Sequence, residues 1–334
     1  MDSVLNILLY FILPLAVTAI LTHQLIPYFH RKQFGQYIRE EGPQAHLKKQ
    51  GTPTMGGLAI VIGIAIGLLI YGVRAHFEVQ ASCCGGTRNA TDAFAILLTM
   101  LLFGVIGFVD DYNKIAKKEN LGLTAKQKLL LQALFSIVLG AYMLMTGRVA
   151  ILIPFFKVYV RLGILYVPFV MFVEIAMSNA VNLTDGLDGL ASGVTAIVGL
   201  TFAAVGWAKG SDILMISGLC VAGALVGFLI FNHYPAKIFM GDTGSMALGG
   251  ILSGIAVVTG NEFLLPLVGL IYVLEALSVI IQVTYFRKTG GKRFFRMAPL
   301  HHHFELGGMK EYNVVYMFCA VTAVLGVITY FAAA

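Results

Sequence analysis

The sequence predicts an all-α polytopic membrane protein with about ten transmembrane helices. Its 334 residues are 58% hydrophobic and only 12% charged, with a mean hydropathy of +0.84, whereas soluble domains carry roughly 25% charged residues. Uncharged runs of about 17–25 residues recur, which is the length of a helix that crosses a bilayer. No stretch alternates between apolar and polar residues as membrane β-strands do.

Ten spans follow from these runs. The first opens with Asp2 and lacks the basic region of a signal peptide, so we expect it to remain as an anchor. Pro266 and Gly269 predict a bend in the ninth span. The predicted spans are 4–29, 53–73, 92–109, 126–146, 161–181, 190–208, 211–231, 244–259, 263–286 and 312–333.

The loops between these spans alternate in charge. One set (30–52, 110–128, 232–243 and 287–311) holds 17 Lys and Arg, and the other set holds six. The positive-inside rule therefore places the first set in the cytoplasm and both termini outside. The net charge of +6 reflects this placement and predicts no nucleic-acid partner. No polar stretch is long enough to bury a core of its own, so residues 1–334 are expected to form a single integral-membrane domain.

Four motifs on the cytoplasmic side carry polar groups. In "GFVDDYNK", Asp110 and Asp111 end the third span with Lys114 close behind. Adjacent carboxylates at a membrane boundary repel each other and lose hydration, so they need a lysine, a metal ion or a proton nearby. A solvated helix end is the alternative interpretation.

The motif "NLTDGLDGLASG" follows the fifth span. Asn182, Asp185 and Asp188 recur at i, i+3 spacing, while Gly186 and Gly189 allow close approach of a ligand or backbone. The ligand spacing of an EF-hand is absent. A structural turn with capping aspartates is the alternative.

The segment "FNHYPAKIFMGDTGSMALGG" joins the seventh and eighth spans. It gathers Asn232, His233, Lys237 and Asp242 within a dozen residues. Capping of the next helix is a second interpretation for Asp242, but it does not explain the clustering.

The first cytoplasmic loop ends "HLKKQGTPTMGG". Its Lys48 and Lys49 fit either anion binding or simple anchoring. Carboxylate-bearing loops with interspersed lysines and histidines together predict a site for Mg²⁺ and phosphate groups, because Mg²⁺ shares its coordination among a few carboxylates, water and substrate phosphates.

Cysteines contribute no chemistry in this prediction. Cys83 and Cys84 are adjacent in an external loop, and Cys220 and Cys319 lie in apolar runs. None has the spacing of a metal or redox site, so we expect packing or loop thiols.

Five motifs resemble, in order and across nearly the whole chain, the phospho-N-acetylmuramoyl-pentapeptide-transferase family of polyprenyl-phosphate N-acetylhexosamine-1-phosphate transferases. They are "GTPTMGG", "DDYNK", "NAVNLTDGLDGLASG", "GDTGSMALGG" and "MAPLHHHFE". The resemblance implies transfer of phospho-MurNAc-pentapeptide from UDP-MurNAc-pentapeptide to undecaprenyl phosphate, with Mg²⁺, giving lipid I and UMP. It further implies a multi-pass protein of the bacterial inner membrane, a cytoplasmic active-site cleft, a bent ninth helix, a homodimer, and binding of nucleoside inhibitors that mimic the UDP-sugar.

The resemblance also implies roles for individual residues. Asp242 is expected to bind Mg²⁺, and Asp110 to deprotonate the lipid phosphate with Asp111 beside it. Lys114 and Lys126 are expected to hold phosphate charge. The expected uridine pocket comprises Lys49, Asp188, Asn232 and Phe239, with Leu183 and Gly186 as walls, and the residues near the ribose and diphosphate are Asn182, Asp185 and Thr54.

The histidines of "PLHHHFE" are the last candidates. Three consecutive side chains point in different directions, and no cysteine lies near them, so a zinc site is not expected. We expect His301 and His302 to reach the active site and to donate hydrogen bonds to the substrate, and His303 to turn away and pack. A purely structural loop is the alternative.

Two other functions remain open from the sequence. A transporter of an anionic metabolite would use the intramembrane Glu174 and Glu275, although transporters place coupling carboxylates near the midplane and the aspartates here cluster at one face. A sister transferase that uses UDP-GlcNAc is the closer alternative.

Overall fold

The computed structural model describes residues 3–32, 49, 51–81, 86–117, 122–153 and 158–333. Lys48, Cys83 and Cys84 lie outside the described residues. The described part of the chain contains ten helices long and apolar enough to cross a membrane. The predicted all-α polytopic fold is therefore confirmed.

Each predicted span corresponds to one long helix, except that the ninth contains a separate short helix before its long one. In chain order the elements are α1 (Ser3–Arg31), α2 (Gly57–Ala81), α3 (Gly86–Lys117), α4 (Ala125–Met145), β1 (Ala150–Ile153), β2 (Val158–Arg161), a 3₁₀ turn (Gly163–Leu165), α5 (Tyr166–Thr184), α6 (Leu190–Lys209), α7 (Asp212–Asn232), α8 (Gly241–Thr259), α9 (Leu264–Val268), α10 (Leu270–Lys288), α11 (Leu300–Glu305) and α12 (Glu311–Ala333).

Helix α8 lies at the centre of the bundle. In the most apolar stretch of α8, 89% of the residues are buried, whereas in the corresponding stretch of α10 only 22% are buried. Small residues permit this because neighbouring backbones approach α8 directly. A Cβ at Gly57 would lie 2.2 Å from the backbone nitrogen of Gly244, and one at Gly107 would lie 2.0 Å from the carbonyl oxygen of Asp242. The first turn of α8 is thus held between α2 and α3.

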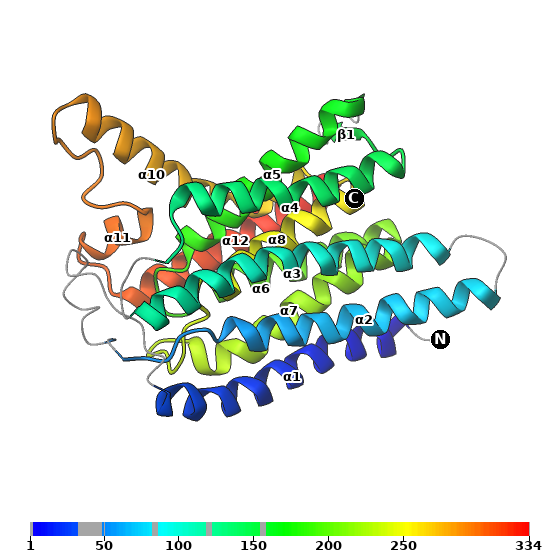
Figure 1. Cartoon of the computed structure of the whole chain (residues 1–334), viewed down its shortest axis with the longest axis horizontal. Coiled ribbons are helices and arrows are strands. Elements are labelled where there is room, and N and C mark those ends of the chain that lie inside the picture. Colours follow the sequence, from blue (N-terminus) through cyan, green and yellow to red (C-terminus); the bar gives the residue numbers. More distant parts are fainter. Residues whose placement is uncertain are drawn as a thin grey trace.

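The ninth span is broken at Gly269. Helix α9, which contains Pro266, ends there, and α10 begins at Leu270. Figure 1 shows α10 leaving the bundle before the chain turns back through α11 to α12. The bend that Pro266 and Gly269 predict is present. Because α10 points away from the bundle after the bend, α11 lies beside one end of the bundle.

A short hairpin between α4 and α5 was not predicted. Strands β1 and β2 are antiparallel, with Ile151 opposite Val160. Four-residue strands are too short to produce a hydropathy signal, so the sequence indicated only a loop. The hairpin lies far from α11 in Figure 1.

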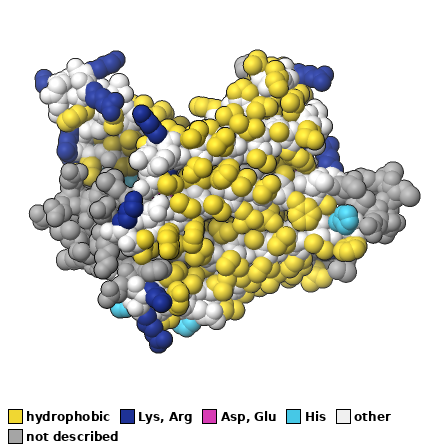
Figure 2. Space-filling model, viewed as in Figure 1, with side chains coloured by type: hydrophobic (Ala, Val, Ile, Leu, Met, Phe, Trp, Pro, Cys, Tyr) yellow, Lys and Arg dark blue, Asp and Glu magenta, His cyan; other side chains and the backbone are white. Residues whose placement is uncertain are grey.

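The two ends of the bundle are distinct. Figure 1 shows the first and last helices starting and finishing toward the same end, as ten crossings require, and α11 lies at the other end. Figure 2 shows hydrophobic side chains across the middle and Lys and Arg toward the ends. We call the end with α11 the site end, and the end with both termini the opposite end.

Candidate active site

Helix α3 extends beyond its predicted span and carries its carboxylates into the site end. The apolar run stops at residue 109, but the helix continues to Lys117. Asp110 and Lys114 are one turn apart, and their side chains form an ion pair of 2.7 Å (Asp110 Oδ2 to Lys114 Nζ), which supports the extra turns. Asp110 and Asp111 are therefore inside a helix and buried, not on a solvated helix end.

Asp110 is held by one hydrogen bond and two ion pairs. Its Oδ1 accepts a hydrogen bond of 2.6 Å from the backbone nitrogen of Leu123. Its Oδ2 lies 2.7 Å from Lys114 Nζ and 3.1 Å from Lys128 Nζ. The carboxylate is completely buried, so these charges replace the water that it has lost.

Asp242 shares both lysines with Asp110. Its Oδ2 lies 2.7 Å from Lys128 Nζ and 3.1 Å from Lys114 Nζ, and its Oδ1 accepts a bond of 2.9 Å from the amide of Asn182. Two lysines thus bridge carboxylates on α3 and α8. The side chain of Asn182 also donates to Ser245 Oγ at 2.8 Å, which fixes the end of α5 against α8.

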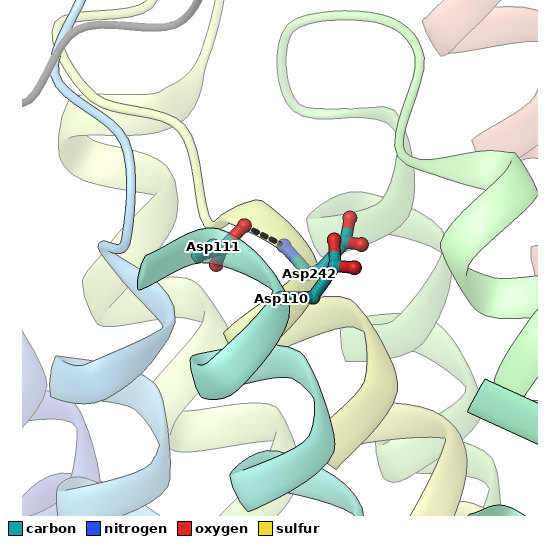
Figure 3. Close-up of side chains that lie close together, drawn as sticks. All are labelled: Asp110, Asp111 and Asp242. Atoms are coloured by element: carbon teal, nitrogen blue, oxygen red, sulfur yellow. Dashed lines mark hydrogen bonds between the residues drawn. The ribbon is translucent and has the colours of Figure 1, made fainter. Parts of the chain in front are cut away.

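Asp111 has a different task from its neighbour. Its Oδ1 accepts from the backbone nitrogen of Asp242 at 3.1 Å, and its Oδ2 accepts from the backbone nitrogen and the hydroxyl of Thr243 at 2.8 and 2.6 Å. Figure 3 shows Asp111 bonded to the backbone of Asp242, while the carboxylates of Asp110 and Asp242 lie together. Asp111 therefore caps α8, the capping role that the sequence left open for Asp242.

The three aspartates have the geometry of a cation site. Each offers one oxygen, and these oxygens lie within 4.8 Å of one another. The donors are all carboxylate oxygens, the ligands that hard divalent cations prefer. Two lysines face three carboxylates, because Asp111 has no lysine partner among the described residues, and this leaves a surplus of negative charge. Asp111 is bonded to the first turn of α8, whereas Asp110 and Asp242 are held mainly by lysine side chains, so Asp110 and Asp242 are the better placed of the three to hold a metal ion.

Lys128 contacts the aspartates, although Lys126 was the residue selected from the sequence. The side chain of Lys126 is exposed on α4, and Lys128 reaches the aspartates instead. A signal was present: Lys128 lies one turn before Gln132 and two before Ser136, and both are on the buried face of α4. Lys126 is on the other face, with Leu130, whose side chain is 63% exposed.

The loop after α5 lies next to these carboxylates. Burial, followed by repulsion from Asp242, Asp111 and Asp188, raises the pKa of Asp185 to about 8. Leu183, in the last turn of α5, and Gly186, in the loop, are half-buried. The raised pKa means that Asp185 keeps its proton near neutral pH, because burial and the neighbouring carboxylates disfavour another negative charge there.

Lys49 and Asp188, both predicted for a uridine pocket, are in contact. Lys49 Nζ lies 2.6 Å from Asp188 Oδ1 and also pairs with Glu311 at the start of α12. Asp188 Oδ2 accepts from the backbone nitrogen of Ala236 at 2.8 Å. Glu311, which the sequence did not single out, accepts from the backbone nitrogen of Asp188 as well. These bonds join the 182–189 loop to α12.

Asn232 and Phe239 shape the neighbouring loop. Asn232 accepts from Ser192 Oγ at 2.7 Å and donates to the carbonyl of Ile238 at 2.9 Å. Phe239 is half-buried, and its backbone pairs with Pro53 and Gly56. Buried Thr54 belongs to this same strand-like pairing beside the start of α8. These backbone bonds therefore hold the "GTPTMGG" motif beside the start of α8, which carries Asp242.

The three histidines diverge, as their spacing predicts. They lie on α11 rather than in a loop. His301 is buried and bonded to Glu275, and His302 Nδ1 lies 2.8 Å from Glu305. His303 accepts from the backbone nitrogen of Arg296 at 3.2 Å and packs edge-on against Phe295.

Two family models match the chain. Glycosyl transferase family 4 matches residues 93–260, and the phospho-N-acetylmuramoyl-pentapeptide-transferase signature 1 matches residues 49–61. A protein with that transferase name from Clostridium botulinum (strain Alaska E43 / Type E3) is 47% identical over 317 residues, covering 95% of this chain and 93% of the relative. One from Heliobacterium modesticaldum is 46% identical over 323 residues, covering 95% and 96%.

The chain belongs to the phospho-N-acetylmuramoyl-pentapeptide-transferase family. It is therefore a membrane-embedded phosphotransferase, and its described residues contain ten helices long and apolar enough to span a membrane. The signature of the phospho-N-acetylmuramoyl-pentapeptide-transferases includes Lys49 and Thr54, and the glycosyl transferase match spans Asp110 through Asp242. Neither family model reaches α11, so the role of the three histidines is argued from the geometry of this chain.

Proposed function

We propose that this protein transfers phospho-MurNAc-pentapeptide from UDP-MurNAc-pentapeptide to undecaprenyl phosphate in a Mg²⁺-dependent reaction that yields lipid I and UMP. The observation that supports this most directly is the pair Asp110 and Asp242, which share Lys114 and Lys128 at one end of a membrane-spanning bundle. A lipid phosphate at the membrane surface and a water-soluble nucleotide can both reach that end.

In this mechanism an oxygen of the lipid phosphate attacks the β-phosphorus of the UDP-sugar. A new P–O bond forms there, the bond to the bridging oxygen breaks, and UMP leaves with the electron pair. Asp242 would hold Mg²⁺, which would neutralise negative charge on the diphosphate when bound. Lys114 and Lys128 hold phosphate oxygens in line. Asp110 accepts the last proton of the lipid phosphate, whose pKa near 6 makes a strong base unnecessary.

The nucleotide is proposed to lie between the 182–189 loop and the 232–240 loop. Lys49, Asp188 and Phe239 line the uridine pocket with Leu183 and Gly186, and Asn182, Asp185 and Thr54 face the ribose and diphosphate. Asn232 is internally bonded, so it acts by holding the pocket in shape. Nucleoside inhibitors that mimic the UDP-sugar are expected to bind here.

Transfer assays separate the three functions considered. Purified protein is incubated with undecaprenyl phosphate, Mg²⁺ and either UDP-MurNAc-pentapeptide or UDP-GlcNAc, each labelled in the sugar. We expect labelled lipid and an equal amount of UMP from the first donor only. Lipid product from UDP-GlcNAc would indicate the sister transferase. Absence of lipid product from both donors, with uptake of an anion into proteoliposomes, would indicate a transporter.

The site is proposed to face the cytoplasm of a bacterial inner membrane, because 17 of 23 Lys and Arg fall in the segments that the sequence predicts as loops on the side of the site motifs. In a variant without native cysteines, Lys117→Cys should resist a membrane-impermeant thiol reagent in intact cells and react after permeabilisation. Labelling before permeabilisation would reverse the orientation. We also propose a homodimer, which light scattering of the detergent-solubilised protein tests.

A further inference from the structure

A buried glutamate on α10 holds both the backbone and the ring of His301. Glu275 Oε1 accepts from the backbone nitrogen of His301 at 3.1 Å, and Glu275 Oε2 lies 2.9 Å from His301 Nδ1. The side chains are 0% and 1% exposed. The first bond fixes where α11 begins, and the second fixes the rotation of the ring.

The second bond also determines which ring nitrogen carries the proton. A carboxylate at this distance accepts hydrogen bonds, so Nδ1 of His301 is the donor and carries hydrogen. In a neutral imidazole the other nitrogen, Nε2, then bears the lone pair. Carboxylates that orient a histidine in this way fix its tautomer in metal sites and in catalytic triads alike.

The remaining nitrogen points at the 182–189 loop. His301 Nε2 is buried and has no hydrogen-bond partner among the residues that the structure describes. A Cβ built on Gly186 would lie 2.2 Å from it, so the ring sits directly over a residue that has no side chain. A buried nitrogen without a partner is costly, and Gly186 adjoins Asp185 at the edge of the carboxylate cluster.

We propose that Glu275 is a positioning residue that fixes His301 as the Nδ1–H tautomer, so that Nε2 accepts a hydrogen bond from a hydroxyl or amide N–H of the UDP-sugar. This inference rests on the proposed function. It reverses the polarity expected from the sequence, in which the histidine donates. The missing partner of Nε2 is then a group of the bound donor substrate.

The test is a change of tautomer without a change of shape. In Glu275→Gln the amide oxygen can still accept from the backbone nitrogen of His301, while the amide NH₂ faces Nδ1 and forces the ring hydrogen onto Nε2. We expect the KM for UDP-MurNAc-pentapeptide to rise about 10- to 100-fold, with the KM for undecaprenyl phosphate and the melting temperature unchanged. Glu174→Gln, at the buried glutamate of α5, is the matched control and should leave both KM values unchanged.

A spectroscopic measurement makes the test independent of turnover. The ¹⁵N resonances of His301, assigned by their loss in His301→Gln, should show a protonated Nδ1 and an unprotonated Nε2 in the native protein and the reverse in Glu275→Gln. An unprotonated Nδ1 in the native protein, or Glu275→Gln kinetics equal to native, would overturn the proposal. So would a KM effect equal for both substrates that follows a fall in melting temperature. If native protein forms no lipid product, the proposed function fails, while the resonances still report the tautomer.

Discussion

The two ends of the bundle both bury charged groups, but they balance them differently. At the opposite end, Asp92 on α3 is held bidentately by Arg148, with Nη1 3.0 Å from Oδ2, and it also accepts from Tyr142. Arg148 further donates to the carbonyl of Val258 at 2.9 Å. One acid and one base therefore satisfy each other and join α3, α4 and α8.

At the site end, charge is not balanced in pairs. Asp110 and Asp242 share Lys114 and Lys128, while Asp111 beside them is held only by hydrogen bonds from the start of α8. Repulsion from Asp242 and Asp111 reaches Asp185 as well. A buried acidic surplus costs stability, and such surpluses are typical of functional sites. The comparison indicates that charge serves stability at one end and ligand binding at the other.

The largest effect is expected from removing one charge at the site end. Asp242→Asn keeps the shape but loses the metal-binding charge, so transition-state stabilisation should fall by about 2–4 kcal/mol, or about 30- to 1,000-fold in rate. Because Asp111 caps α8, the helix should remain stable. Rates measured over a range of Mg²⁺ concentrations check this. Native turnover at ordinary Mg²⁺ would exclude the metal role.

The lysine pair on α4 sharpens the assignment within the site end. Lys128→Met removes a charge that contacts both Asp110 and Asp242, and kcat/KM should fall about 100-fold. Lys126→Met changes the same residue type two positions away on the exposed face and should stay within about twofold of native. Equal losses in the two variants would show that Lys126, the residue that the sequence indicated, also contributes to phosphate binding.

At the opposite end, the same type of substitution should affect stability and not turnover. Asp92→Asn leaves Arg148 without its anion, and the free energy of unfolding should fall by about 1–3 kcal/mol, discounted for the partial exposure of the arginine. Denaturation of the detergent-solubilised protein gives the stability, and the transfer rate per folded protein should match native. A loss of rate without a loss of stability would contradict the contrast between the ends.

A smaller, pH-dependent effect is expected from Glu262, also at the opposite end. Burial raises its pKa to about 7 from an ordinary value of 4.5, despite the hydrogen bond from Tyr166. Between these values the folded protein retains a proton that the unfolded chain releases, so stability falls as pH rises from about 4.5 to 7. Glu262→Gln should flatten this slope and gain about 1 kcal/mol at pH 8. An unchanged slope of melting temperature with pH would contradict the shift.

The sequence predicted what depends on a single helix and missed what depends on how helices face one another. Span lengths and the break at Gly269 are local properties, and both were predictable. Lys128 was missed because Lys126 was assigned from the family resemblance, without regard to which face of α4 is buried. The capping of α8 by Asp111 and the pairing of Glu275 with His301 depend on the rotation of α3 and α10 about their axes. No pattern within one helix specifies that rotation.

The break at Gly269 also determines how motion would be transmitted to the site. Helix α10 has 19 residues and so acts as a lever about 28 Å long. A tilt of about 5° at its base would move its far tip by about 2.5 Å, but Glu275, six residues along, by only about 0.8 Å. The clamp on His301 is attached close to the pivot. Such a tilt would therefore move the exposed tip of α10 about three times as far as the residue that holds His301.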